Sequence, residues 1–175
     1  ICILEDYEHA LKRGASIYGE VAGFGQTNDA HGLRTAPASG KYYARAMGLA
    51  LDEAQIHPSQ IGYVSLDGRA LPAHDQTEVE ALYQAFGADA ALLPVSVPRT
   101  MLGHSFAAAG TLDTITALLS LEHRLIPPTI NCEELDPRYN LDLVQDEARP
   151  LSKDAVLICG RSLTGANVAL AVRSL

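Results

Sequence analysis

The chain has 175 residues, of which 13 are lysine or arginine and 21 are aspartate or glutamate, so its formal net charge is −8. Hydrophobic residues make up 47% and charged residues 19%, a composition that excludes a disordered chain and suits one globular domain over residues 1–175. The acidic balance, with no basic cluster longer than Lys12-Arg13, argues against nucleic acid or an anionic membrane surface as a partner, since both bind clustered cations.

In the first third of the chain, the pattern predicts a buried strand at residues 1–5, a polar turn at 7–13 and a second strand at 17–24. A loop rich in Gly, Thr, Asn, Pro and Ser follows at residues 26–40, and loops of this kind often carry function. Residues 41–54 place apolar side chains at helical spacing, which predicts an amphipathic helix.

Strands and helices then alternate, which indicates a layered α/β protein. The remaining predicted elements are strands at 61–66 and 92–97, helices at 76–86 and 104–122, an acidic loop at 131–150, and closing strands at 155–159 and 167–173. The helix at 104–122 is apolar nearly all round, so we expect it to be buried on most sides in the middle of the fold.

Cysteine spacing and hydropathy indicate a reducing, cytoplasmic setting. Cys2, Cys132 and Cys159 are too far apart for a CxxC metal site and do not form a disulfide framework. The histidines show no metal-ligand spacing, and we expect neither a metal nor a cofactor. We find no apolar run of the roughly 18 residues that span a bilayer and no basic leader, so we expect no membrane partner. Because the chain starts inside an apolar run at Ile1, we expect part of the fold to precede it.

Polar residues and glycine gather at three strand-to-loop junctions, at residues 67–69, 99–104 and 161–167. In layered α/β proteins the loops at strand ends converge while the sheet holds them still, so we expect a site there. His104 is the clearest single candidate, because we expect it to open the long helix, where a ligand oxygen would meet both the imidazole and the helix N-terminus. A capping or core role for this histidine fits the spacing equally well.

Four separated stretches resemble the β-ketoacyl synthases. YVSLDGRALPAHDQTE (63–78) is similar to the motif in which a strand ends in His-Gly-Thr and leads to Thr-Pro, Asn-Asp and Glu. PVSVPRTMLGHSFAAAG (94–110) is similar to the segment with Lys, Gly-His and Ala-Ala-Gly. IPPTIN (126–131) and LICGRSLTGANVAL (157–170) resemble the Ile-Pro-Pro-Thr-x-Asn stretch and the Gly-Phe-Gly-Gly-x-Asn loop. This resemblance implies the C-terminal half of the α/β thiolase fold, with its layered αβαβα architecture.

The chain departs from this family at positions that carry its chemistry. Asp67 takes the place of the first catalytic histidine, Arg99 that of the lysine, and Leu163 that of a flexible phenylalanine, whereas His104 retains the second histidine. The other family loop positions are Thr164, Gly165 and Asn167. The family nucleophile is a cysteine of the N-terminal half, and none of the three cysteines here matches it. We therefore expect none of Asp67, Arg99 and His104 to be an active catalytic residue.

Decarboxylative condensation needs a thiolate and hydrogen-bond donors aimed at the oxygens where negative charge develops. An ionised carboxylate at position 67 would disfavour that charge by about 4 kcal/mol at roughly 4 Å, with an effective dielectric near 20. Losing one donor costs about 2.7–4 kcal/mol more. Arg99 stays protonated and cannot act as a base, so a structural ion pair with Asp67 or Glu78 is the preferred interpretation. A protonated Asp67 would restore a donor, although a nearby arginine favours the ionised form.

Together with these departures, the resemblance implies a chain-length factor, the non-catalytic ketosynthase β subunit of a type II polyketide synthase, which bounds the tunnel that limits polyketide or polyene length. The implied partners are the N-terminal half of its own fold, an active ketosynthase α subunit, and an acyl carrier protein. Because such carriers are acidic, like this chain, we expect the carrier to dock mainly on the partner subunit.

Two alternatives stay open. One is a divergent but active β-ketoacyl synthase, acyltransferase or malonyl decarboxylase that uses His104 and a cysteine outside this chain. The other is a scaffold that binds a carrier protein or an acyl chain without influencing product length.

Overall fold

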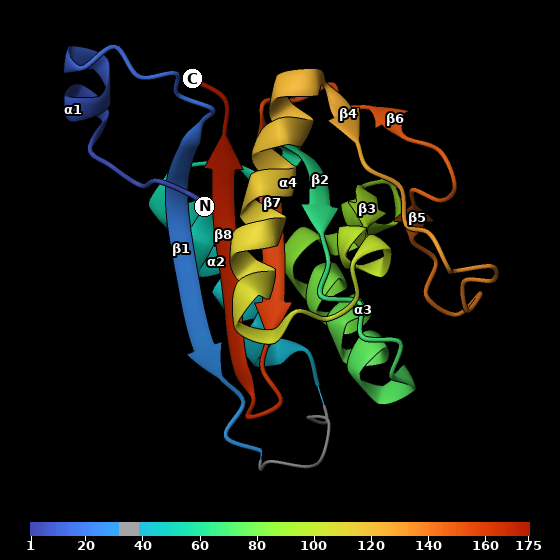
Figure 1. Ribbon diagram of the computed structural model, residues 1–175. Helices are drawn as coiled ribbons and strands as arrows, with labels where there is room; N and C mark the ends of the chain where they lie inside the picture. Colours follow the sequence, from blue (N-terminus) through green and yellow to red (C-terminus); the bar gives the residue numbers. More distant parts are fainter. Residues whose placement is uncertain (32–38) are drawn as a thin grey trace.

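The computed structural model describes residues 1–31 and 39–175 (Figure 1). A mixed six-stranded sheet is formed by β1 (Glu20–Asn28), β2 (Ile61–Ser65), β3 (Pro94–Ser96), β5 (Asp142–Leu143), β7 (Ala155–Arg161) and β8 (Ala166–Arg173). Its strand order is β1-β8-β7-β2-β3-β5. Strands β2, β3, β5 and β7 are parallel, whereas β8 is antiparallel to its neighbours β1 and β7.

Helices cover both faces of this sheet. On one face lie α2 (Lys41–Ala54) and α3 (Pro72–Phe86), and on the opposite face lies α4 (Ala109–His123), which runs across the front of the sheet in Figure 1. The shorter elements are α1 (Tyr7–Lys12), β4 (Leu125–Ile126), β6 (Arg149–Pro150) and 3₁₀ turns at Pro58–Gln60, Gly87–Ala91, Pro98–Met101 and Phe106–Ala108.

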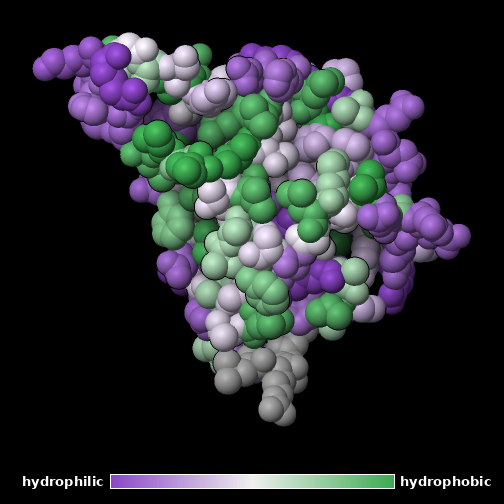
Figure 2. Space-filling view, viewed as in Figure 1, coloured by the Kyte–Doolittle hydropathy of each residue, from purple (hydrophilic) through white to green (hydrophobic). Residues whose placement is uncertain are grey.

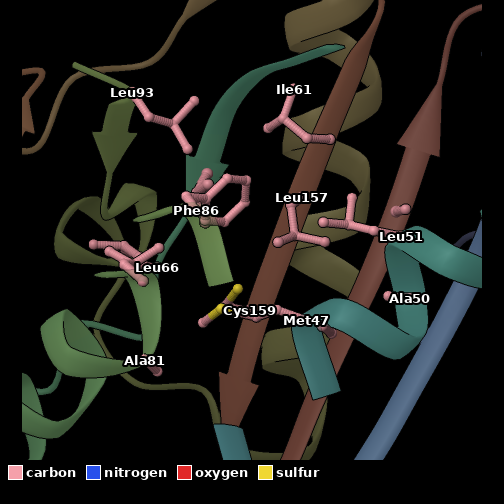
Figure 3. Close-up of a cluster of buried hydrophobic side chains, with 14 of the residues drawn as sticks. Met47, Ala50, Leu51, Ile61, Leu66, Ala81, Phe86, Leu93, Leu157 and Cys159 are labelled. Atoms are coloured by element: carbon pink, nitrogen blue, oxygen red, sulfur yellow. The ribbon is translucent and has the colours of Figure 1, made fainter. Parts of the chain in front are cut away.

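Alternation along β7 separates two hydrophobic cores, because successive side chains of a strand point to opposite faces of the sheet. Leu157 and Cys159 belong to the larger core, where they pack with Met47 and other residues of α2 and α3 (Figure 3). Val156 and Ile158 belong to the core under α4. Burial on both faces explains why β7 reads as a continuous apolar run rather than an alternating one.

Most predicted elements are present. The helix predicted at residues 41–54 is α2, the turn predicted at 7–13 contains α1, and the strands predicted from residue 61 onward correspond to β2, β3, β7 and β8. The helix predicted from residue 76 begins earlier, at Pro72, which occupies a first-turn position where its missing N–H is harmless. The acidic stretch 131–150 is mostly loop but contains the short strands β5 and β6.

The strand predicted at residues 1–5 is wrong. In the described chain this segment has no strand partner, and Ile3 and Leu4 are 75% and 79% exposed. Strand β1 starts later than predicted and continues through the first residues of the predicted 26–40 loop. Residues 32–38 of that loop lie outside the described residues.

Helix α4 differs from its prediction in two ways. It begins at Ala109, after a 3₁₀ turn, so His104 lies in the preceding loop and does not open the helix. Its sheet-facing side is buried, but Leu119 is 40% exposed on the outer side, and hydrophobic surface extends over this face of the molecule (Figure 2). The expected burial on most sides is therefore wrong for the described chain. No helix within residues 1–31 and 39–175 is long and apolar enough to cross a lipid bilayer.

Close packing of β1 on α2 depends on glycine. A Cβ added at Gly25 would lie 1.9 Å from the carbonyl oxygen of Ala46, and one added at Gly23 would lie 2.1 Å from that of Ala50. The two elements touch backbone to backbone at these points, which fixes the depth at which β1 sits below the helix.

We predict that Gly25→Ala lowers the free energy of unfolding by about 1–3 kcal/mol or more, because β1 or α2 must move to admit the methyl group. Gly48→Ala is the matched control, since a Cβ at this α2 position meets nothing within 4 Å and should stabilise the helix by about 0.5–1 kcal/mol. Urea unfolding of both variants checks this. Equal stability of the two would contradict the packing argument.

Candidate functional site

The three predicted junctions converge on one cavity of about 460 Å³. It lies at the carboxyl ends of β2 and β7, beside the beginning of α4. Asp67, Arg99, His104 and Leu163 all line it. The structure thus brings together residues as far apart in the sequence as Asp67 and Leu163. Asn167 is fully buried, and the turn that precedes it contains the exposed Thr164 and the half-buried Gly165.

A buried carboxylate is the centre of the site. Asp67 is 5% exposed, and its two oxygens face two different guanidinium groups. Oδ1 accepts a hydrogen bond from Nη1 of Arg99, and Oδ2 accepts one of 2.5 Å from Nε of Arg69. The ion pair expected for Arg99 is therefore formed with Asp67 rather than with Glu78. Arg69 provides Asp67 with a second cation.

Arg99 bridges two acids. Besides Asp67 it contacts Asp113 of α4, whose Oδ2 accepts hydrogen bonds from Nε, at 2.9 Å, and from Nη2. Burial alone would lower the pKa of Arg99, but the hydrogen bonds and charges of Asp113 and Asp67 raise it. Arg99 therefore stays a cation and cannot serve as a general base.

Two carboxylates on α3 hold the loop that carries Asp67. Glu78 accepts the backbone N–H groups of Asp67 and Gly68 at 2.9 Å each, and it also accepts the hydroxyl of Tyr43 at 3.0 Å. Asp75, three residues earlier on the same helix face, accepts the backbone N–H of Arg69 at 3.0 Å. Three successive amides of the loop are thus fixed by the helix that follows it.

A second polar cluster lies where β7, β8 and β1 meet. Nη2 of Arg161 donates to Oδ2 of Asp29 at 2.6 Å, and Nδ2 of Asn167 donates to Oδ1 of the same carboxylate at 2.8 Å. The guanidinium of Arg161 also lies over the ring of Tyr43, 5.8 Å from its centroid. Asn167, a predicted loop position, therefore has a structural partner.

The remaining candidates are more accessible. His104 is exposed, and its ring makes an edge contact with Phe106, with 5.0 Å between centroids. Leu163 is 60% exposed at the cavity edge. Nδ1 of His74 is buried without a hydrogen-bond partner among the described residues.

None of the described contacts activates a cysteine. Cys159 is fully buried in the larger core, and burial raises the pKa of its thiol well above the usual value, with the charges of Glu78 and Asp67 acting in the same direction. Cys2 is exposed near the chain start, and Cys132 lies in a loop. Within residues 1–31 and 39–175, no group of three or more His, Cys, Asp or Glu side chains is arranged to hold a metal ion.

Sequence reasoning missed Asp113, although this acid in a largely apolar helix did carry a signal. Arg69 and Arg161 were placed within the predicted junctions, but no role was given to them, because their partners come from other elements and cannot be read from spacing.

We predict that Arg99→Met lowers the free energy of unfolding by about 3–5 kcal/mol, because it leaves the buried carboxylate of Asp113 uncompensated. Arg99→Met combined with Asp113→Leu should recover much of this loss, since the unpaired charge is gone. The exposed Arg138–Asp136 pair provides the control, and Arg138→Met should leave the free energy of unfolding almost unchanged, because water screens this pair. Urea unfolding of the wild type, of Arg99→Met, of Asp113→Leu alone, of the double variant and of Arg138→Met decides this. A double variant as unstable as the sum of its single changes would show that the two side chains are not coupled.

Glu78 makes stability depend on pH. Burial, assisted by the charge of Asp67, raises its pKa from the ordinary 4.5 to about 7. Between these values the unfolded chain releases a proton that the folded chain keeps, so this group destabilises the fold progressively as pH rises from about 4.5 to 7 and has no further effect above. We predict a loss on the order of 3 kcal/mol over this range. In Glu78→Gln, the free energy of unfolding should not fall in this way between pH 4.5 and 7. Urea unfolding of both proteins at pH 5, 6, 7 and 8 measures this, and the same dependence of the free energy of unfolding on pH in both proteins would refute the prediction.

Comparison with known proteins places this geometry in context. The family model for the C-terminal domain of β-ketoacyl synthases matches residues 18–133. The chain is 36% identical over 173 residues to 3-oxoacyl-[acyl-carrier-protein] synthase 2 of Synechocystis sp., covering 99% of this chain and 42% of that protein. It is 36% identical over 171 residues to an actinorhodin polyketide putative beta-ketoacyl synthase 1 of Streptomyces coelicolor, covering 98% and 37%. The chain thus spans about two fifths of the length of these relatives.

Solved structures agree. A type II polyketide synthase acyl-carrier protein in complex with its ketosynthase superposes with a TM-score of 0.93 at 32% identity, covering 98% of this chain and 42% of the other. The ishigamide ketosynthase/chain length factor superposes with a TM-score of 0.90 at 35% identity, covering 97% and 41%. The thiolase-like fold of a C-terminal ketosynthase half is therefore established for the chain.

Proposed function

Because this chain belongs to the β-ketoacyl synthase family, whose C-terminal domain it carries, we propose that it is part of a non-catalytic, chain-length-factor-like subunit of a type II polyketide synthase. In this role it bounds the space in which a polyketide or polyene grows by decarboxylative condensation of malonyl units on a carrier protein. A partner ketosynthase supplies the reacting groups.

The state of Asp67 carries this proposal. At the position that corresponds to a catalytic imidazole in the family, the chain has a carboxylate whose two oxygens both accept hydrogen bonds from arginines. A carboxylate engaged in this way has no N–H to offer an oxyanion, and the loss of one such donor costs about 2.7–4 kcal/mol, or 10²–10³ in rate. The pairing also removes most of the repulsion expected from a free negative charge, so the missing donor is the larger effect.

The arginines do not replace that donor. Nη1 of Arg99 is directed at Asp67, and Nε and Nη2 are directed at Asp113. Arg69 gives Nε to Asp67 and Nη2 to the carbonyl of Arg161. Releasing Arg99 toward a reacting oxygen would leave the buried Asp113 uncompensated, and releasing Arg69 would remove the partner of Oδ2 of Asp67; both changes are costly. Both guanidinium groups therefore stabilise the fold rather than bind a substrate.

The proposed partners are an active ketosynthase subunit, the remaining part of the same fold, and a carrier protein that docks mainly on the ketosynthase. The named structures support this, since one holds a carrier protein with its ketosynthase and another a ketosynthase with a chain length factor. The outer face of α4, with the exposed Leu119, and the open cavity edge with Leu163 are the surfaces that such neighbours would cover.

A second candidate is a divergent active ketosynthase, acyltransferase or malonyl decarboxylase. It is favoured by one observation, namely that His104 is retained and exposed on the cavity, where its ring can meet a ligand. This activity requires a cysteine at the family nucleophile position outside the chain. Glutamine, glycine or alanine at that position would instead favour the non-catalytic subunit.

The experiment compares product length. The partner ketosynthase is given malonyl carrier protein with and without the full-length subunit. We expect the defined product length to require the subunit. His104→Ala in this subunit should leave yield and length unchanged within about twofold, whereas the active-enzyme candidate predicts a loss of about 10²–10³ in rate. An identical product distribution without the subunit would disprove the proposal and favour a passive scaffold.

A further inference from the structure

The charged groups around the cavity form one continuous chain of contacts. It runs from Asp113 to Arg99, to Asp67 and to Arg69. These four side chains come from α4, the turn after β3 and the loop between β2 and α3, and each is at most 10% exposed. This series of contacts continues beyond Arg69, because Nη2 of Arg69 donates to the backbone carbonyl of Arg161 at the end of β7.

From Arg161 the series of contacts continues to Asp29, which follows the edge strand β1. The side chain of Arg161 pairs with Asp29, which also accepts Asn167. The backbone N–H of Asp29 donates to the carbonyl of Gly165 at 2.9 Å. The turn formed by residues 162–165 is thus attached to the end of β1 on one side and, through Arg69, to the loop after β2 on the other.

The turn has its own internal hydrogen bonds, which do not involve Arg69. Oγ of Ser162 accepts the backbone N–H groups of Thr164 at 3.2 Å and Ala166 at 3.0 Å. These bonds set the shape of the turn. What Arg69 adds is the connection between this turn and the neighbouring loop, across the cavity edge that Ser162 and Leu163 line.

Arg69 is itself held firmly. Its backbone N–H is bound by Asp75, and it lies between Gly68 and Ala70, both with positive φ, at 48° and 56°. A Cβ at Gly68 would lie 2.5 Å from the side chain of Val97, so this loop has little freedom to carry its arginine elsewhere. A guanidinium offers several N–H donors in one rigid plane, which suits simultaneous contact with a carboxylate and a carbonyl.

We propose that Arg69 is a positioning residue that locks the 162–165 turn, and with it Leu163, against the β2–α3 loop. Without Arg69, the Asp113–Arg99–Asp67 group and the Arg161–Asp29–Asn167 group remain linked through Tyr43, whose ring lies under Arg161 and whose hydroxyl donates to Glu78. This link does not hold the carbonyl of Arg161, so the turn that follows it gains mobility while its attachment to β1 remains. This inference concerns mobility and goes beyond the proposed function, because it holds whether or not the subunit takes part in condensation.

The test is amide hydrogen exchange of the full-length protein with its natural partner. In Arg69→Gln, we expect exchange in residues 161–166 to become at least about tenfold faster while α2 (41–54) stays unchanged. Arg69→Lys keeps a cation beside Asp67 but loses the planar fork, so it should retain overall stability and still accelerate exchange in the turn. Arg138→Gln, which removes the exposed pair with Asp136, is the control and should change neither region.

Two results would overturn the proposal. Unchanged exchange at 161–166 in the glutamine variant would mean that the turn is held without Arg69. Equal acceleration in α2 would mean that Arg69 acts only on overall stability. If the glutamine variant does not fold, wild-type exchange in the lysine variant overturns the proposal equally. Product length is not measured here, so this outcome and that of the product-length experiment are independent.

Discussion

The shared carboxylate of Asp67 is the contact on which the rest of the site depends. Two guanidinium groups contact this carboxylate, and all three side chains are largely buried. The opposite charges offset the cost of removing each charge from water. Remove this acid and Arg69 loses its carboxylate partner, while Arg99 keeps only Asp113 among the described acids. These ion pairs connect the loop after β2, the turn after β3 and α4 at the cavity wall.

The sheet makes such a balance possible. Parallel β2, β3 and β7 lie side by side and end at one edge, so residues that follow each strand meet there regardless of their separation in sequence. The helix α3 then adds two acids at a spacing of three residues, and Asp75 and Glu78 fix successive amides of the β2–α3 loop. Rigid strands supply proximity, and the helix supplies orientation.

Much of this was predictable from sequence. Alternating apolar segments located the strands and helices, and the four family-like stretches led to the thiolase fold and to the cavity residues Asp67, Arg99, His104 and Leu163. The strand expected at residues 1–5 did not form, because apolar composition cannot supply the neighbouring strand that a ladder needs.

Other features depended on tertiary contacts. The start of α4 was misplaced because the Ala-rich run before Ala109 has helical composition but folds as a 3₁₀ turn with no side-chain cap. Asp113 was overlooked, and Arg69 was placed at a junction without a role, because the contribution of a buried charge is set by partners on other elements. The network also bears on which side chains position 67 tolerates. An imidazole introduced there would meet two arginines and leave Arg69 without its acid, so a cationic or neutral residue at this position demands compensating changes at its neighbours.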